Sequence, residues 1–215
     1  MKFCFIPGYA CKGEIFKEIC SRIPDSFYVD YPLNKMSEID TMDKLCALIL
    51  ETYKVQLDDC SAIIGHSLGG GVAMHLSLRP EFQNVQIVTL DYFLSFPPPF
   101  FRNYCSERTP DSIHEYVREM LQECKPLFNQ GVVNSDDDYN LEYLEKRHSI
   151  NKKKLIAIYG MRSEDSSEQV CKNLSYPAGF ERFLDLYFIK DSAHFPMLEN
   201  PSDLELILRD VLDGL

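Results

Sequence analysis

Short apolar runs alternate along the chain with longer segments whose apolar residues recur every three or four positions. The runs indicate buried strands, and the longer segments indicate helices with one apolar face. The predicted strands are 3–6, 27–31, 61–65, 85–90, 154–159 and 184–189, and the predicted helices beside them are 13–21, 37–54, 68–78 and 201–212. Strands and helices that alternate in this way predict a doubly wound α/β fold with a mostly parallel sheet.

The residues between the fourth and fifth predicted strands break this alternation. They begin with the sequence FLSFPPPFF, whose three prolines exclude regular structure. Helices are predicted over 111–128 and 139–148, with a polar turn at 134–138. We therefore divide the chain into a core, 1–91 with 154–215, and a helical cap insertion, 92–153. Such a cap would cover the carboxyl edge of the sheet, where open α/β sheets bind ligands.

The composition fits a globular domain and excludes some partners. Of the 215 residues, 45% are apolar. The chain has 22 Lys and Arg and 33 Asp and Glu, which gives a formal net charge of −11. The single basic run, Lys152–Lys154, precedes a predicted strand and is interpreted as a solubilising loop. A nucleic acid or an anionic membrane would need a basic face, so neither is expected as a partner.

The apolar stretches and the cysteines indicate a cytoplasmic location. The N-terminal apolar stretch, 3–7, is too short for a signal sequence, and no later stretch reaches the roughly 18 apolar residues of a membrane-spanning helix. The eight cysteines include no C-x-x-C pair, and several fall in apolar segments, as expected of reduced thiols in a core. No cluster of metal ligands is evident, and no metal or organic cofactor is expected.

The strongest chemical signal is a G-x-S-x-G motif, Gly65-His66-Ser67-Leu68-Gly69, between a predicted strand and a predicted helix. In such a strained turn a side chain at either glycine would strike the neighbouring strand or helix. The motif therefore predicts that Ser67 is a nucleophile. The alternative interpretation is a serine that only caps the helix.

A serine nucleophile needs a base, and His194 is the best placed of five histidines. It follows the last predicted strand in a loop that opens onto the same edge of the sheet as Ser67. His66 is expected to point away from the serine, His75 is interpreted as structural, and His114 and His148 as surface residues of the cap.

A carboxylate should orient the imidazole and stabilise its protonated form. Three acids satisfy the order Ser…Asp/Glu…His. Asp165 and Glu164 follow the fifth predicted strand, and Asp91 follows the fourth. Asp165 is the first choice, and the other two stay open.

The tetrahedral intermediate needs two hydrogen-bond donors for its oxyanion. The backbone N–H of Leu68, which begins the helix after the serine, is the first expected donor. The second is the N–H of Tyr9, in the Pro7-Gly8 turn after the first predicted strand.

Over nearly its whole length the sequence resembles the α/β-hydrolase superfamily, through the Pro7-Gly8-Tyr9 turn, the Gly65–Gly70 elbow, the loop 160–165 and Ala193-His194-Phe195. It looks most similar to small carboxylesterases of the pimeloyl-carrier methyl ester esterase kind. The resemblance implies roles as nucleophile for Ser67, base for His194 and oxyanion donors for Leu68 and Tyr9.

Three departures from the family pattern bear on these roles. The fold is expected to be reduced at its N-terminus, because members commonly begin with an extra β-hairpin. Proline takes the place of histidine in the usual His-Gly turn, and Ser163 stands where the acid is usual. Asp91 is at a site that some members use.

The leading function is a serine esterase that acts on a small-molecule ester through an acyl-enzyme on Ser67. Phe93, Phe96, Phe100 and Phe101 suggest an apolar substrate group, or else packing of the cap onto the sheet. An acyl thioesterase is the enzyme alternative, although an acidic surface would repel an acidic carrier protein. A non-catalytic receptor on a hydrolase fold is the second alternative. The oligomeric state is left open.

Overall fold

The computed structural model describes residues 1–94, 103–136, 141–162, 164, 166–174, 176 and 178–213. Its strands in this part of the chain are β1 (Lys2–Ile6), β2 (Ser26–Tyr28), β3 (Cys60–His66), β4 (Gln86–Leu90), β5 (Leu155–Gly160) and β6 (Leu184–Ile189). They form one sheet in the order β2-β1-β3-β4-β5-β6, and every neighbouring pair is parallel. The predicted α/β class and parallel sheet are confirmed.

Burial follows the position of each strand in the sheet. All residues of β4 and β5 are buried, and β3 is buried except at Ser61, because layers of helices cover both faces. The edge strand β2 is partly exposed and ends at Tyr28, three residues before the predicted end. The N–H of Asp30 donates to the Tyr53 hydroxyl at 3.0 Å, so the backbone has left the sheet there.

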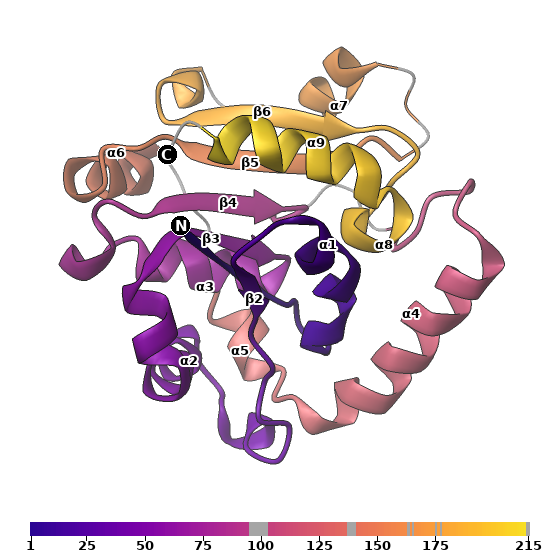
Figure 1. Ribbon diagram of the computed structural model, residues 1–215, viewed down its shortest axis with the longest axis horizontal. Coiled ribbons are helices and arrows are strands. Elements are labelled where there is room, and N and C mark those ends of the chain that lie inside the picture. The colour runs from indigo at the N-terminus through magenta and orange to yellow at the C-terminus, as the bar shows by residue number, and fades with distance from the viewer. Residues whose placement is uncertain are drawn as a thin grey trace.

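The helices that flank the sheet are α1 (Lys17–Arg22), α2 (Met42–Asp58), α3 (Leu68–Leu76) and α9 (Pro201–Leu212). Figure 1 shows α1 and α9 on one face and α2 and α3 on the other, and each of these pairs is in contact. Helix α2 begins five residues later than predicted, because Thr41 is extended and its hydroxyl caps the helix by accepting from the Lys44 N–H.

Between β4 and β5 the structure has α4 (Asp111–Cys124), α5 (Gly131–Asn134) and α6 (Leu141–Ile150). Pro126 lies in a 3₁₀ turn after α4, so the helix ends four residues before the predicted end. Figure 1 shows α4 beyond the end of the sheet toward which the arrow of β4 points. The short helices α5, α7 (Ser167–Leu174) and α8 (Pro196–Glu199) were not predicted. The proline run lies outside the described residues.

Candidate active site

Ser67 occupies a sharp turn between β3 and α3. Its backbone angles, φ 49° and ψ −126°, lie where residues with side chains are strained. Ser67 stands at the N-cap position of α3, but in the described structure its side chain makes no cap hydrogen bond to the helix. Its N–H donates to the Leu90 carbonyl at 3.0 Å, and its carbonyl accepts from the Gly70 N–H at 2.7 Å. Backbone hydrogen bonds to β4 and to α3 therefore hold the turn, and Ser67 lines the pocket.

The two glycines of the motif are required by close packing. A Cβ at Gly65 would overlap the carbonyl oxygen of Gly69 in α3, and a Cβ at Gly69 would overlap the carbonyl oxygen of Ile6 in β1. The expected clashes with helix and strand are both present. The second contact also places α3 directly against the strand that leads into the Pro7-Gly8 turn.

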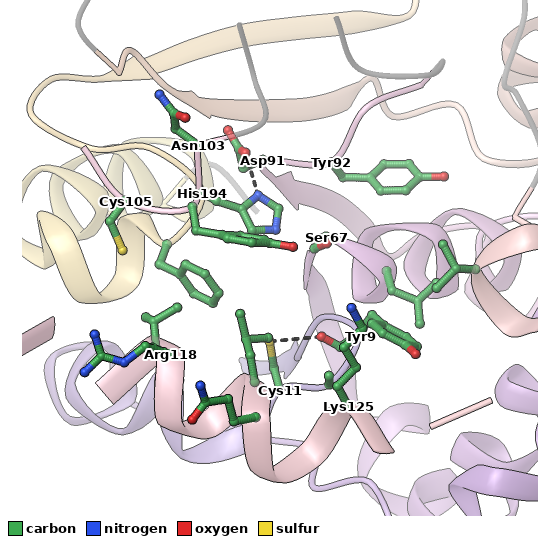
Figure 2. A pocket seen from close by; sticks show the side chains of 18 of the residues that line it. Tyr9, Cys11, Ser67, Asp91, Tyr92, Asn103, Cys105, Arg118, Lys125 and His194 are labelled. Carbon is green, nitrogen blue, oxygen red and sulfur yellow. Dashed lines mark hydrogen bonds and ion pairs between the residues drawn. The ribbon is translucent and has the colours of Figure 1, made fainter. Parts of the chain in front are cut away.

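His194 lies in the loop between β6 and α8, and its ring is held by Asp91. The Nδ1 atom of His194 lies 2.7 Å from Oδ2 of Asp91, which directly follows β4 and is fully buried. Ser67, Asp91 and His194 line one pocket. Figure 2 shows the imidazole between Asp91 and Ser67, with its second nitrogen turned toward the serine. The three residues come from the turns that follow β3, β4 and β6, all at the carboxyl edge of the sheet.

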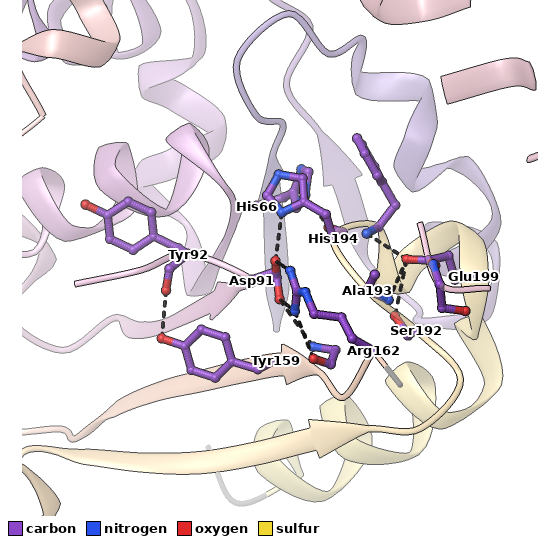
Figure 3. Close-up of polar contacts among 12 residues, drawn as sticks. His66, Asp91, Tyr92, Tyr159, Arg162, Ser192, Ala193, His194 and Glu199 are labelled. Atoms are coloured by element: carbon purple, nitrogen blue, oxygen red, sulfur yellow. Dashed lines mark hydrogen bonds and ion pairs between the residues drawn. The ribbon is translucent and has the colours of Figure 1, made fainter. Parts of the chain in front are cut away.

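Arg162, which sequence analysis missed, shares the Asp91 carboxylate with His194 (Figure 3). Its two terminal nitrogens donate to Oδ1 and Oδ2 at 2.9 and 2.6 Å, and the Gly160 N–H donates to Oδ1 at 3.3 Å. Burial by itself would raise the pKa of Asp91, but the Arg162 guanidinium and the hydrogen bond with His194 hold it well below its usual range. Asp91 is therefore ionised and fixed in orientation.

Glu164, another candidate acid, makes its described contacts away from His194. Glu164 lines a separate polar cavity of about 320 Å³ beside Arg162, and its Oε1 accepts from Asn173 Nδ2 at 3.4 Å. Asp165, the first choice of sequence analysis, and Ser163 lie outside the described residues. The acid that contacts the imidazole is thus Asp91, which had been left as an alternative.

The side chain of His66 makes a hydrogen bond to the backbone of His194. Its Nε2 lies 2.7 Å from the carbonyl oxygen of His194, so this nitrogen carries the proton and donates. Burial, and then the nearby His194, lower the pKa of His66 to about 3, which keeps its ring neutral. His66 therefore fixes the backbone of the His194 loop.

The neutral state of His66 makes the stability of the fold depend on pH. The unfolded chain binds a proton at this residue below about pH 6.5 and the folded chain does not, so the free energy of unfolding should fall as pH drops from 6.5 toward 3. We expect His66→Gln, which keeps a donor in a similar place, to lose less stability over this range. Urea midpoints at pH 7.0, 6.0 and 5.0 measure this, because the stability that the lowered pKa of Asp91 contributes is lost only below about pH 5. Equal losses in both proteins would contradict the assignment.

The two predicted oxyanion donors lie beside Ser67. Tyr9 and Leu68 both line the pocket, and a Cβ at Gly8 would come within 2.9 Å of the Ser67 Cβ. Leu68 is the first residue of α3, and N–H groups of a first helical turn have no partner within the helix. The Pro7 carbonyl accepts from the buried Tyr31 hydroxyl at 2.6 Å, which fixes the turn after β1.

The pocket above these groups has a volume of about 1270 Å³ and a largely apolar wall. Val117 and Leu121, on one face of α4, contribute to this wall. The aromatic residues that line it are Tyr9, Tyr92, Phe93, Tyr104 and Phe195. Phe93 lines the pocket as expected, and Phe96, Phe100 and Phe101 are outside the described residues. The site can therefore hold a ligand with a sizeable apolar part.

Backbone strain gathers at this edge of the sheet. Ser67, Asp91, Arg162 and Asp191 all have positive φ, between 46° and 56°, and each lies within two residues of the end of a strand. Ala10, in the turn after β1, has a φ of 57°.

Within the described part of the chain, no group of three or more His, Cys, Asp or Glu could hold a metal ion. None of the helices in that part is both long and apolar enough to cross a membrane.

The fold and the turn after β3 define an α/β-hydrolase. The family model of the thioesterase domain matches residues 3–133, more than half of the chain. The protein belongs to this thioesterase family. No curated protein matches the sequence.

Solved structures with the same fold extend over almost the whole chain. MenH from S. aureus is 12% identical, with a TM-score of 0.69, and the match covers 100% of this chain and 94% of MenH. A thermophilic esterase is 18% identical, with a TM-score of 0.71 and coverage of 99% and 90%. The methylesterase MES16 from Arabidopsis is 14% identical, with a TM-score of 0.63 and full coverage of both chains.

Proposed function

We propose that this protein is a serine hydrolase that cleaves a carboxylic ester with an apolar group, through an acyl-enzyme on Ser67. The observation that carries the proposal is the 2.7 Å contact between Asp91 and His194 in the pocket that also contains Ser67. Esterase and hydrolase chemistry is what the family and the fold support at a coarser level.

In the proposed reaction the Ser67 hydroxyl attacks the ester carbonyl while Nε2 of His194 accepts its proton. Asp91 accepts from Nδ1–H, which selects the tautomer with a free Nε2 and stabilises the imidazolium. The N–H groups of Leu68 and Tyr9 donate to the oxyanion. The imidazolium then protonates the leaving alcohol, and a water molecule activated by the neutral ring releases the acid. Asp91 takes the role that sequence analysis gave first to Asp165.

Residues 92–153 act as the cap of this enzyme, since α4 supplies one wall of the pocket. The volume and the aromatic lining favour a small-molecule ester with an extended acyl or alcohol part. All eight cysteines are free, which is consistent with the proposed cytoplasmic location because disulfides are rare in that compartment.

Acyl thioesters are the second candidate substrates, because the matching family is described as a thioesterase domain. The same serine would attack the thioester carbonyl, and a thiol would leave in place of the alcohol.

Hydrolysis by the wild-type protein tests the proposal. The substrates are p-nitrophenyl esters of increasing chain length, each beside a thiol ester with the same acyl group, and a fluorophosphonate probe reports on Ser67. We expect labelling at Ser67 and a higher kcat/KM for the oxygen esters. Higher values for the thiol esters would select the second candidate. Absence of both labelling and turnover would refute the serine hydrolase and favour a receptor on a hydrolase fold.

A further inference from the structure

The backbone around His194 is held by a carboxylate that does not touch the imidazole. The N–H groups of Ala193 and Phe195, on either side of the histidine, both donate to Oε2 of Glu199, at 2.8 and 2.9 Å (Figure 3). The His194 N–H donates to the carbonyl of Tyr104 at 3.0 Å. Three consecutive backbone donors of this loop are therefore satisfied from outside it, two of them by one side chain.

The second oxygen of Glu199 faces a different part of the chain. Its Oε1 accepts from the Ser106 N–H at 2.7 Å and from the Thr109 hydroxyl at 2.6 Å. These residues belong to the described segment 103–110 that leads into α4, whose face lines the pocket. A single carboxylate thus joins the loop of His194 to the segment that carries the pocket wall.

We infer that Glu199 is a positioning residue for His194, and that one of its oxygens holds the loop of this base while the other is anchored to the segment 103–110. The inference rests on the proposed function, because it concerns the base of that reaction. The imidazole is aimed by its own backbone, and Glu199 holds the two N–H groups that flank it. Bonds to an ionised acceptor are stronger than neutral ones, so the carboxylate can hold both segments at once.

The need for a carboxylate follows from the donors around it. Every group that contacts Glu199 at 2.9 Å or less is a donor: the N–H groups of Ala193, Phe195 and Ser106 and the hydroxyl of Thr109. A carboxylate offers acceptors on both oxygens. Glutamine has the same shape, but its NH₂ group would face donors on one of the two sides, and that side would lose its hydrogen bonds.

The test compares Glu199→Gln with Thr109→Val, which removes the bonds of the Thr109 hydroxyl to Glu199 and to the Ser106 hydroxyl and keeps the two N–H bonds of the His194 loop to Glu199. For Glu199→Gln we expect kcat and the rate of fluorophosphonate labelling to fall together by roughly 10- to 100-fold with KM little changed, because a small displacement of a catalytic group is costly. Thr109→Val should lower Tm and keep kcat close to the wild-type value. Should Glu199→Gln fail to fold, Glu199→Asp carries the test, since the shorter side chain cannot span both segments and should lower kcat in the same way.

Two results would overturn the inference. One is a Glu199 variant that folds and keeps the wild-type kcat and labelling rate. The other is a loss of kcat that follows Tm equally in Glu199→Gln and Thr109→Val, which would make the carboxylate merely structural. A wild-type protein that neither turns over esters nor labels at Ser67 would instead refute the proposed function, and this inference with it.

Discussion

Replacing Ser67 with alanine is expected to abolish ester turnover while leaving the fold intact. The reaction loses its nucleophile, so kcat should fall by roughly 10⁴-fold or more. The side chain makes no cap bond to α3, so its removal should cost little stability. Initial rates with p-nitrophenyl esters, fluorophosphonate labelling and a thermal melt measure the three quantities.

Ser77→Ala at the other end of α3 is the matched control for Ser67→Ala. The buried Ser77 hydroxyl donates to the Met74 carbonyl at 2.6 Å and accepts from Nε of Arg147 at 3.2 Å. Its removal should lower Tm and spare activity. Turnover that survives in Ser67→Ala would refute the acyl-enzyme.

Replacing Asp91 with asparagine is expected to lower kcat by roughly 10³- to 10⁴-fold, because the neutral amide can select the wrong tautomer of His194 and cannot stabilise its charge. The same change removes the carboxylate charge of Asp91 from its buried ion pair with Arg162, which should destabilise the fold by about 3–5 kcal/mol. Rates are therefore measured at a temperature where the variant is folded, as circular dichroism can verify.

Arg162→Met separates the two effects of Asp91→Asn. It breaks the same ion pair, at 2.6 Å, but leaves the carboxylate on His194. Its stability should fall by a similar amount and its kcat much less. Asp165→Asn tests the acid that sequence analysis preferred. A severe loss in Asp165→Asn together with normal rates in Asp91→Asn would move the acid to Asp165 and leave the class of enzyme unchanged.

The alternation of strands and helices could be predicted because the inner strands β1, β3, β4 and β5 are covered on both faces and form apolar runs. The end of α4 could not be placed as well, since the apolar pattern continues past Pro126. The four-residue helix α8 is too short to give a periodic pattern.

The candidate site was predictable where local sequence decides the geometry. Ser67 was found because its turn needs two glycines, and His194 because chain order places its loop at the same edge. The choice among three acids depends on which loop reaches the imidazole, and that is set by how neighbouring strands align. Arg162 and Glu199 were missed for a related reason. Arg162 lies 71 residues from Asp91 in the chain. Glu199 is close in the chain to Ala193 and Phe195, but its other partners, Ser106 and Thr109, lie 93 and 90 residues away.

The left-handed turns at Ser67, Asp91, Arg162 and Asp191 have a consequence for attempts to make this protein more heat-resistant. Each such residue costs of order 1–3 kcal/mol, and glycine or a relaxed backbone would remove that cost. Selection for thermal tolerance alone is therefore expected to favour changes at the very turns that aim the reacting groups. Engineering for higher Tm would have to keep these turns unchanged and introduce stabilising substitutions in helices away from the carboxyl edge of the sheet.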